Sequence, residues 1–135
     1  MSNNSLFNTN IEHETINNQY FRKVIFTGKH MQLVLMSLKI GENIPKEIHK
    51  NVDQFFRIEQ GKAKFITSDK IITATDKDVV IIPSGTEHEI INIGTNELKL
   101  YTIYSPANHP AETIDKTKLD ADYREKFVHL LNLFD

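Results

Sequence analysis

Four polar side chains in the middle of the chain have the types and spacing of a metal site. Glu47 and His49 are two residues apart in a segment with strand character, so their side chains leave the same face of that strand. Gln54 opens the next expected strand, and opposed side chains of an antiparallel hairpin lie about 5 Å apart at Cβ. His88 follows the turn at residues 83–85 in a separate segment. We predict that these four side chains bind one ion.

The donor types narrow the choice of metal. Two imidazoles, a carboxylate and an amide oxygen suit Fe(II), Mn(II), Ni(II), Co(II) or Zn(II), and they leave positions open on an octahedral ion. Burying the Glu47 carboxylate without a cation would be costly, so an inward-facing Glu47 itself favours a metal. The 135 residues include no cysteine, which excludes thiolate ligands, disulfides and a cysteine nucleophile. The sequence therefore predicts a divalent metal cofactor and leaves its identity open.

Short strands must position these side chains. From residue 21 to residue 105, β-rich runs alternate with turn signals, and no helical pattern separates them. This arrangement favours an antiparallel sandwich or barrel. The strands are expected near residues 22–27, 31–40, 44–49, 54–60, 62–67, 70–74, 78–83, 87–92 and 98–105.

The barrel at 21–105 is flanked by two terminal segments. Residues 1–20 are polar and rich in asparagine, which predicts a loose arm, or one that is ordered only against a partner. The tail at 106–135 contains one helix, near 119–132, that would pack on the barrel or on a neighbouring subunit. Its apolar stripe consists of Tyr123, Phe127, Leu130, Leu131 and Phe134.

The strand at 31–40 is apolar on both faces, whereas an antiparallel barrel strand normally has one face exposed to water. Its outer face must therefore be covered by the terminal segments or by a second subunit. Together with the otherwise unexplained arm, this pattern predicts a homodimer.

The polar residues and their flanking glycines resemble the two motifs of the cupin superfamily. The first motif matches at Gly41, Glu47, His49, Gln54 and Gly61, and the second at Pro83, Gly85, His88 and Asn92, with Lys77 in place of its first glycine. The resemblance covers residues 31–105 and implies an all-β, double-stranded β-helix (a jelly-roll barrel), here followed by a C-terminal helix, with the metal inside its mouth. The six-residue spacing to Gly61 favours Gln54 as the fourth ligand over Asp53, which would then sit in the turn.

Within that superfamily the chain most resembles small stand-alone cupins described as similar to mannose-6-phosphate isomerase. The resemblance is carried by residues 27–30, 53–55 and 101–106. Relative to the true sugar-phosphate isomerases, the Glu and Gln have exchanged places. The sugar-phosphate-binding domains of those enzymes have no room in 135 residues.

Two kinds of function remain open. The first is a metal-dependent enzyme acting on a small polar substrate, by sugar-type isomerisation or epimerisation or by dioxygenase chemistry. His30, Tyr101 and Tyr104 are weak candidates for catalytic groups, whereas His109, in a proline-flanked tail, is expected at the surface. The second is a non-catalytic module that binds or senses a metal or a small molecule.

Charge and hydropathy limit the partners. A net charge of −2 without a basic stripe argues against nucleic-acid binding. Neither a signal peptide nor an apolar run of the roughly 20 residues that span a bilayer is visible, so we expect a cytoplasmic protein with no membrane partner.

Overall fold

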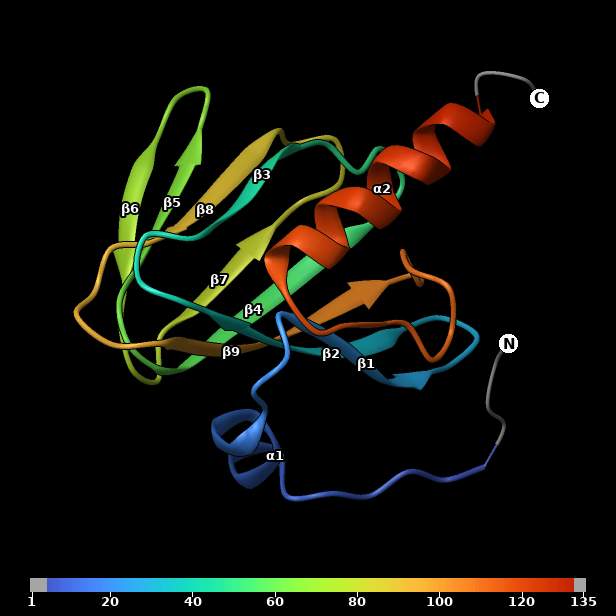
Figure 1. Cartoon of the computed structure of the whole chain (residues 1–135), viewed down its shortest axis with the longest axis horizontal. Helices are drawn as coiled ribbons and strands as arrows, with labels where there is room; N and C mark the ends of the chain where they lie inside the picture. Colours follow the sequence, from blue (N-terminus) through green and yellow to red (C-terminus); the bar gives the residue numbers. More distant parts are fainter. Residues whose placement is uncertain (1–4, 133–135) are drawn as a thin grey trace.

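The computed structural model describes residues 5–132, and it describes side chains as far as residue 127. Within that range the chain forms two β-sheets and two helices (Figure 1). The elements are α1 (Ile11–Asn17), β1 (Arg22–Thr27), β2 (Gln32–Leu38), β3 (Asn43–Glu47), β4 (Asp53–Gln60), β5 (Ala63–Thr67), β6 (Ile71–Ala74), β7 (Val79–Ile82), β8 (His88–Asn92), β9 (Leu98–Ser105), β10 (Ile114–Asp115) and α2 (Lys118–Asn132). The all-β class and the C-terminal helix are thereby confirmed.

The two sheets face each other as the layers of a jelly roll. The larger sheet has the order β10-β1-β2-β9-β4-β7 and the smaller one the order β3-β8-β5-β6, with antiparallel pairing throughout. Alternation along the strands sends one set of side chains inward; on β4 these are Gln54, Phe56 and Ile58, all buried. The core is the apolar space between the sheets, and its polar end carries Gln54.

The outer face of the larger sheet is covered by the N-terminal segment. Helix α1 contacts β2, β4 and β9, and Figure 1 shows it against that face. Asn10 caps the helix by accepting a hydrogen bond from the His13 backbone N–H at 2.9 Å. Leu35, whose side chain points outward from β2, is only 1% exposed as a result. The outer face of the strand at 31–40 was expected to be covered by a terminal segment or by a second subunit. In the structure the N-terminal segment covers it.

The C-terminal segment forms β10 beside β1 and then continues into α2. Strand β10 pairs with β1, and α2 lies across the space between β1 and β3 (Figure 1). The described members of the predicted apolar stripe face outward: Tyr123 and Phe127 are 74% and 54% exposed, and Leu119, one turn earlier, is 77% exposed. Leu130, Leu131 and Phe134 lie outside the residues whose side chains are described. No helix of the described range is long and apolar enough to cross a membrane.

Candidate metal centre

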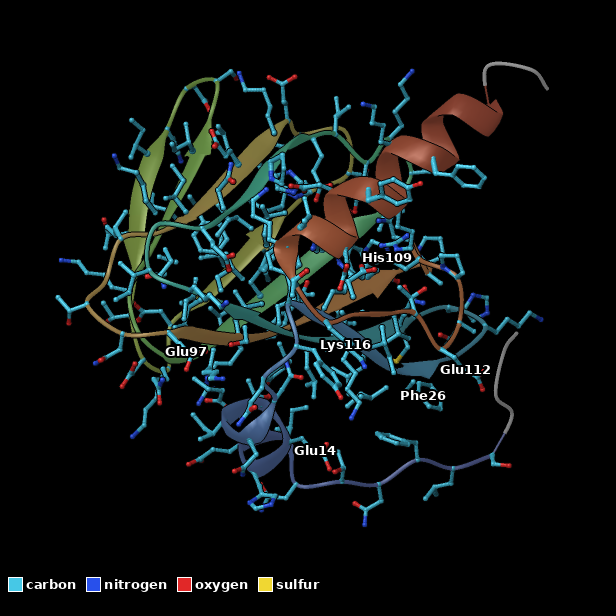
Figure 2. All side chains as sticks on the ribbon, in the orientation of Figure 1. Glu14, Phe26, Glu97, His109, Glu112 and Lys116 are labelled. Atoms are coloured by element: carbon cyan, nitrogen blue, oxygen red, sulfur yellow. The ribbon has the colours of Figure 1, made fainter. Side chains whose placement is uncertain are left out.

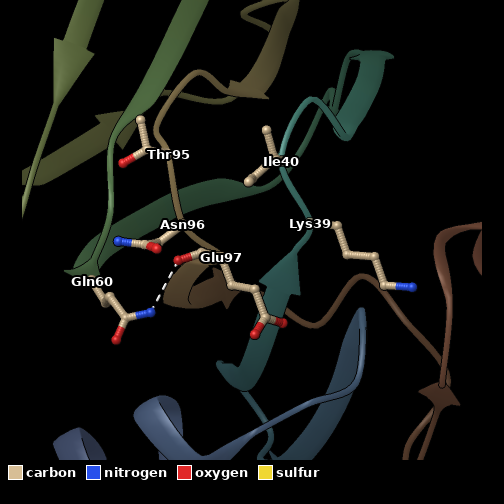
Figure 3. A pocket seen from close by; sticks show the side chains of 6 residues that line it. All are labelled: Lys39, Ile40, Gln60, Thr95, Asn96 and Glu97. Atoms are coloured by element: carbon tan, nitrogen blue, oxygen red, sulfur yellow. Dashed lines mark hydrogen bonds between the residues drawn. The ribbon is translucent and has the colours of Figure 1, made fainter.

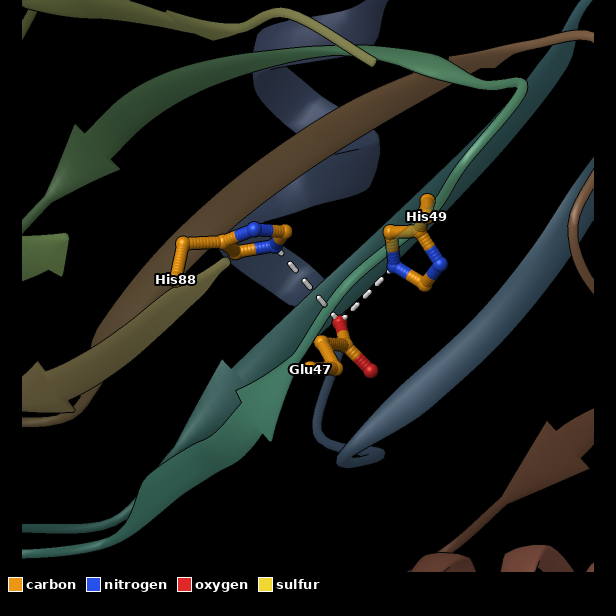
Figure 4. A group of neighbouring side chains, drawn as sticks. All are labelled: Glu47, His49 and His88. Atoms are coloured by element: carbon orange, nitrogen blue, oxygen red, sulfur yellow. Dashed lines mark ion pairs between the residues drawn. The ribbon is translucent and has the colours of Figure 1, made fainter. Parts of the chain in front are cut away.

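Glu47, His49 and His88 meet between the two sheets (Figure 4). Each offers one ligand atom, and the three atoms all lie within 4.8 Å of one another. The Glu47 Oε1 is 3.1 Å from the His49 Nε2 and 3.8 Å from the His88 Nε2. The sequence placed these three residues at one site, and the structure brings them together.

The three side chains converge because of strand pairing and one irregularity. Glu47 ends β3 and is the direct partner of His88, which begins β8. A shift in the register between Ile44 and Glu47 turns the end of β3, and His49 follows just beyond the strand. The backbone carbonyl of His49 accepts a hydrogen bond from the Gly85 N–H at 2.8 Å, which ties the loop to the turn before His88.

The expected hairpin between the Glu47 and Gln54 segments is wrong. Strand β3 belongs to the smaller sheet and pairs with β8, whereas β4 belongs to the larger sheet and pairs with β7 and β9. The loop at residues 48–52 therefore crosses from one sheet to the other. Gln54 consequently approaches from the sheet opposite Glu47, and it is the cross-strand partner of Tyr104.

The ring of His88 is held as the tautomer that a metal needs. Its Nδ1 lies 2.8 Å from the Thr86 carbonyl oxygen, which can only accept, so in the neutral ring Nδ1 carries the hydrogen. The Nε2 then presents a lone pair. It is buried and has no hydrogen-bond partner. A backbone carbonyl on the far nitrogen is the usual support of a metal-binding histidine.

The side chain of Gln54 is also fixed with its oxygen unused. Its Nε2 donates to the Thr102 Oγ1 at 3.0 Å, and its Oε1 is buried without a hydrogen-bond partner. Asp53, by contrast, is exposed and accepts a hydrogen bond from the Ser84 backbone N–H at 2.9 Å. Asp53 was expected in the turn but is the first residue of β4, and its side chain bonds to the turn at residues 83–85; the buried oxygen makes Gln54 the better candidate ligand.

The residues present fit a divalent metal. The Nε2 of His49, the Nε2 of His88 and the Oε1 of Gln54 are all buried without hydrogen-bond partners. Leaving such a group unsatisfied costs about 1–3 kcal/mol, and a cation among the clustered ligand atoms would satisfy the two histidine nitrogens together with the Glu47 carboxylate. The nitrogen and oxygen donor set is the one that Fe(II), Mn(II), Ni(II), Co(II) and Zn(II) accept.

The three weak catalytic candidates lie in different places. His30 is exposed in the turn between β1 and β2. Tyr101 points to the outer face of the larger sheet and packs on Phe55, with ring centroids 6.2 Å apart. Tyr104 is buried on the inner face, and its ring centroid lies 5.9 Å from that of His49. Burial raises the pKa of Tyr104 well above its usual value, so its hydroxyl stays protonated.

The expected surface position of His109 is wrong. Only 9% of this residue is exposed, and its Nε2 lies 3.2 Å from the hydroxyl of Tyr104. The cause is Gln32, a fully buried side chain that accepts from the backbone N–H of His109 at 3.0 Å and donates to its carbonyl at 2.8 Å. Burial, aided by the nearby Arg22 and Arg124, lowers the pKa of His109 to about 2, so the ring is neutral.

A buried charged cluster beside the site was missed from the sequence. Arg22 bonds to Asp115 at 3.2 Å and to Glu125 at 3.0 Å, while Arg124 grips Asp115 through two nitrogens. Burial lowers the pKa of Arg22, but nearby acidic groups, Glu47 among them, outweigh it and raise that pKa. The sequence did carry one indication that Arg22 is buried: it is two residues before Val24 on β1, so both side chains point inward. Its partners lie 93 and 103 residues away in sequence, beyond the reach of local patterns.

A surface hollow away from this cluster is a different feature. It has a volume of about 840 Å³ and lies at the end of β4 opposite Gln54 (Figure 3). Its lining consists of Lys39, Ile40, Gln60, Thr95, Asn96 and Glu97. One hydrogen bond, from the Gln60 Nε2 to the Glu97 carbonyl at 3.1 Å, crosses it. It contains none of the candidate metal ligands.

Known proteins share both this fold and much of this sequence. The cupin domain profile matches residues 34–104. The YrkC protein of Bacillus subtilis is 48% identical over 121 residues, which cover 85% of this chain and 65% of YrkC, so the chain spans just under two thirds of that relative. The L612 protein of Acanthamoeba polyphaga mimivirus is 49% identical over 116 residues, covering 83% of this chain and 72% of L612.

A solved structure extends the likeness to three dimensions. The crystal structure of BH2720 from Bacillus halodurans has 39% sequence identity and a TM-score of 0.87, covering 89% of this chain and 96% of BH2720. The chain belongs to the cupin family. The cupin resemblance inferred from the two motifs is confirmed.

Proposed function

We propose that the protein binds one divalent metal ion through Glu47, His49, Gln54 and His88, and that it uses the ion to act on a small polar molecule. The observation that carries this proposal is that Glu47, His49 and His88 bring their ligand atoms together while the Nε2 of both histidines is buried without a hydrogen-bond partner. A bound ion would supply Lewis acidity to a carbonyl or hydroxyl group, or a place for dioxygen.

The chain's own residues prepare the site. Thr86 fixes the tautomer of His88, and Thr102 fixes the amide of Gln54. Both supports place a donor on the far side of the ligand group and leave the lone pair toward the site. The core around Phe56, whose ring lies 6.4 Å from that of His88, keeps water from that side.

The two reaction types can be separated by one pair of assays. Protein loaded with Fe(II) is tested for oxygen consumption with small polar substrates, and protein loaded with Mn(II) for aldose–ketose conversion or epimerisation. Turnover that disappears in His88→Ala supports an enzyme. Stoichiometric metal binding without turnover in either assay supports the alternative, a non-catalytic binding or sensing module.

We also propose that the protein forms a homodimer. The support is the outward apolar stripe of Leu119, Tyr123 and Phe127 at successive turns of α2. A second copy that covers this stripe would remove two aromatic side chains from water, which is the kind of anchor that dominates protein interfaces.

A further inference from the structure

A chain of hydrogen bonds connects α2 to the wall of the candidate metal site. Arg124, on α2, lies with its Nη2 3.4 Å from the His109 Nδ1, and the His109 Nε2 lies 3.2 Å from the Tyr104 hydroxyl. Figure 2 shows His109 on the segment that follows β9. The ring of Tyr104 packs edge-on against both His109 and His49, at centroid distances of 5.2 and 5.9 Å.

The direction of each bond follows from which groups can accept. A guanidinium only donates, so the His109 Nδ1 must accept from Arg124 and carry no hydrogen. The hydrogen of the neutral ring is therefore on Nε2, and Nε2 donates to the oxygen of Tyr104. The hydroxyl hydrogen of Tyr104 must then point away from His109, and the side chain of Gln54, its cross-strand partner, lies within hydrogen-bonding reach of that hydroxyl.

Further hydrogen bonds hold both Arg124 and His109 in place. Arg124 donates three hydrogen bonds to Asp115, at 3.0 and 3.2 Å from Nε and 2.9 Å from Nη2. Gln32 clamps the backbone of His109 on both its N–H and its carbonyl. A donor whose direction is set in this way costs little further ordering when a ligand binds.

The charges around the proposed metal site favour the binding of an anion. Arg22 and Arg124 are balanced by Asp115 and Glu125, which they contact. Glu47 balances only one of the two charges of a divalent ion, so the loaded site keeps one positive charge. The Nε of Arg22 is, in addition, buried without a hydrogen-bond partner.

We propose that the small molecule bound beside the metal is a carboxylate, and that Tyr104, oriented by His109 and Arg124, donates a hydrogen bond to one of its oxygens. This inference rests on the proposed metal function. A single surplus charge and one neutral hydroxyl donor match a monoanion. They suit a phosphate dianion less well, because phosphate sites draw on arginine forks or on clusters of backbone N–H groups. Tyr104 thereby recognises the ligand, and His109 is a positioning residue.

The test uses Co(II)-loaded protein and its visible absorption spectrum. Acetate is the probe, acetamide its neutral isostere, and inorganic phosphate the rival anion. We expect acetate to perturb the spectrum and to bind at least about 10-fold more tightly than either of the other two. We expect Tyr104→Phe to weaken acetate binding by about 10-fold, the effect of losing one hydrogen bond to a charged group, while Co(II) affinity stays unchanged.

Two further variants separate recognition from general disturbance. Tyr101→Phe removes a hydroxyl from the outer face of the same strand and should leave acetate binding unchanged. His109→Phe should weaken acetate binding as Tyr104→Phe does, and the double variant should be little worse than either single one, because both act through one bond.

The outcomes distinguish this inference from the function on which it rests. Failure to bind Co(II) would overturn the metal site and, with it, the carboxylate proposal. Normal Co(II) binding with no preference for acetate, or an acetate affinity that Tyr104→Phe leaves intact, would overturn the carboxylate proposal alone. Tighter binding of phosphate would do the same.

Discussion

The Glu47 carboxylate and the His88 imidazole face each other across β3 and β8, with Oε1 3.8 Å from Nε2. Because the Thr86 carbonyl accepts a hydrogen bond from the His88 Nδ1–H, the two facing atoms both carry lone pairs when the ring is neutral. Two acceptors held face to face in a buried place repel each other unless something positive lies between them. This relationship is a second physical reason for the proposed cation.

The choice of the fourth ligand can be tested on neighbouring residues. Gln54→Ala should lower metal occupancy, because it removes the buried Oε1 that faces the inner space. Asp53→Ala should have a smaller effect, since its carboxylate bonds to the Ser84 backbone and is exposed. The measurement is metal content after dialysis against a fixed concentration of Mn(II). Equal losses in the two variants would remove the reason to prefer Gln54.

His109 should make the fold sensitive to acid. Its folded pKa of about 2 lies below the value near 6.5 of an unfolded histidine, so between these two values the unfolded chain binds more protons. Stability is therefore retained above pH 6.5 and lost as the pH falls, by up to about 1.4 kcal/mol per pH unit. Urea denaturation from pH 8 to pH 4.5 measures it.

His109→Gln is the matched variant, because glutamine does not titrate. The difference in unfolding free energy between the two proteins should be constant above pH 7 and should change below pH 6.5, in favour of the variant. A difference that stays flat through the whole range would show that His109 is not held neutral in the fold.

Most of the strands were predictable from the sequence, because turn-forming residues mark where each strand ends. All nine expected strands are present, and Gly41, Gly61 and Gly85 have the positive φ values that such turns need. Helix α1 was missed because its short sequence has few apolar residues, and it depends on the Asn10 cap and on the sheet beneath it. The strands β3 and β4 were paired wrongly, since adjacency in sequence does not reveal a crossing between sheets.

The site was predictable in part. Spacing in two short motifs located Glu47, His49 and His88, and the structure gathers them. The surroundings were not predictable, because they depend on long-range contacts. His109 is buried by Gln32, which lies 77 residues away, and Arg22 meets Asp115 across 93 residues. No local pattern carries that information.

Lys77 offers a test of backbone strain in the turn before β7. It stands where the second cupin motif has glycine, and its φ of 72° lies in the left-handed region. Lys77→Gly should raise the free energy of unfolding by about 0.5–1 kcal/mol, because relief of strain exceeds the added freedom of the unfolded chain. Thermal and urea denaturation measure the change.

Gly85→Ala is the reverse control. Its φ is 82°, and a Cβ there would meet no atom within 4 Å, so the substitution changes backbone strain alone. It should destabilise the fold by about 1 kcal/mol. A Lys77→Gly protein no more stable than the parent would show that the turn carries no strain at residue 77.

The proposed homodimer predicts a particle of twice the 15.6 kDa chain mass in light scattering at micromolar concentration. Replacing both Tyr123 and Phe127 with serine should shift it toward the monomer, because it removes the exposed aromatic anchors of α2. Lys126→Ser, on the same helix and also exposed, is the control. A parent protein that is monomeric under these conditions would refute the dimer.

The central claim is tested most directly by metal analysis of the purified protein after loading with Mn(II), Fe(II), Co(II), Ni(II) or Zn(II) and removal of excess ion. The account predicts a single tightly held ion per chain in the parent protein, and an affinity at least about 100-fold lower in His88→Ala, with Glu87→Ala as the exposed neighbouring control. A parent protein that retains none of these ions, or a His88→Ala variant that retains as much as the parent, would contradict it.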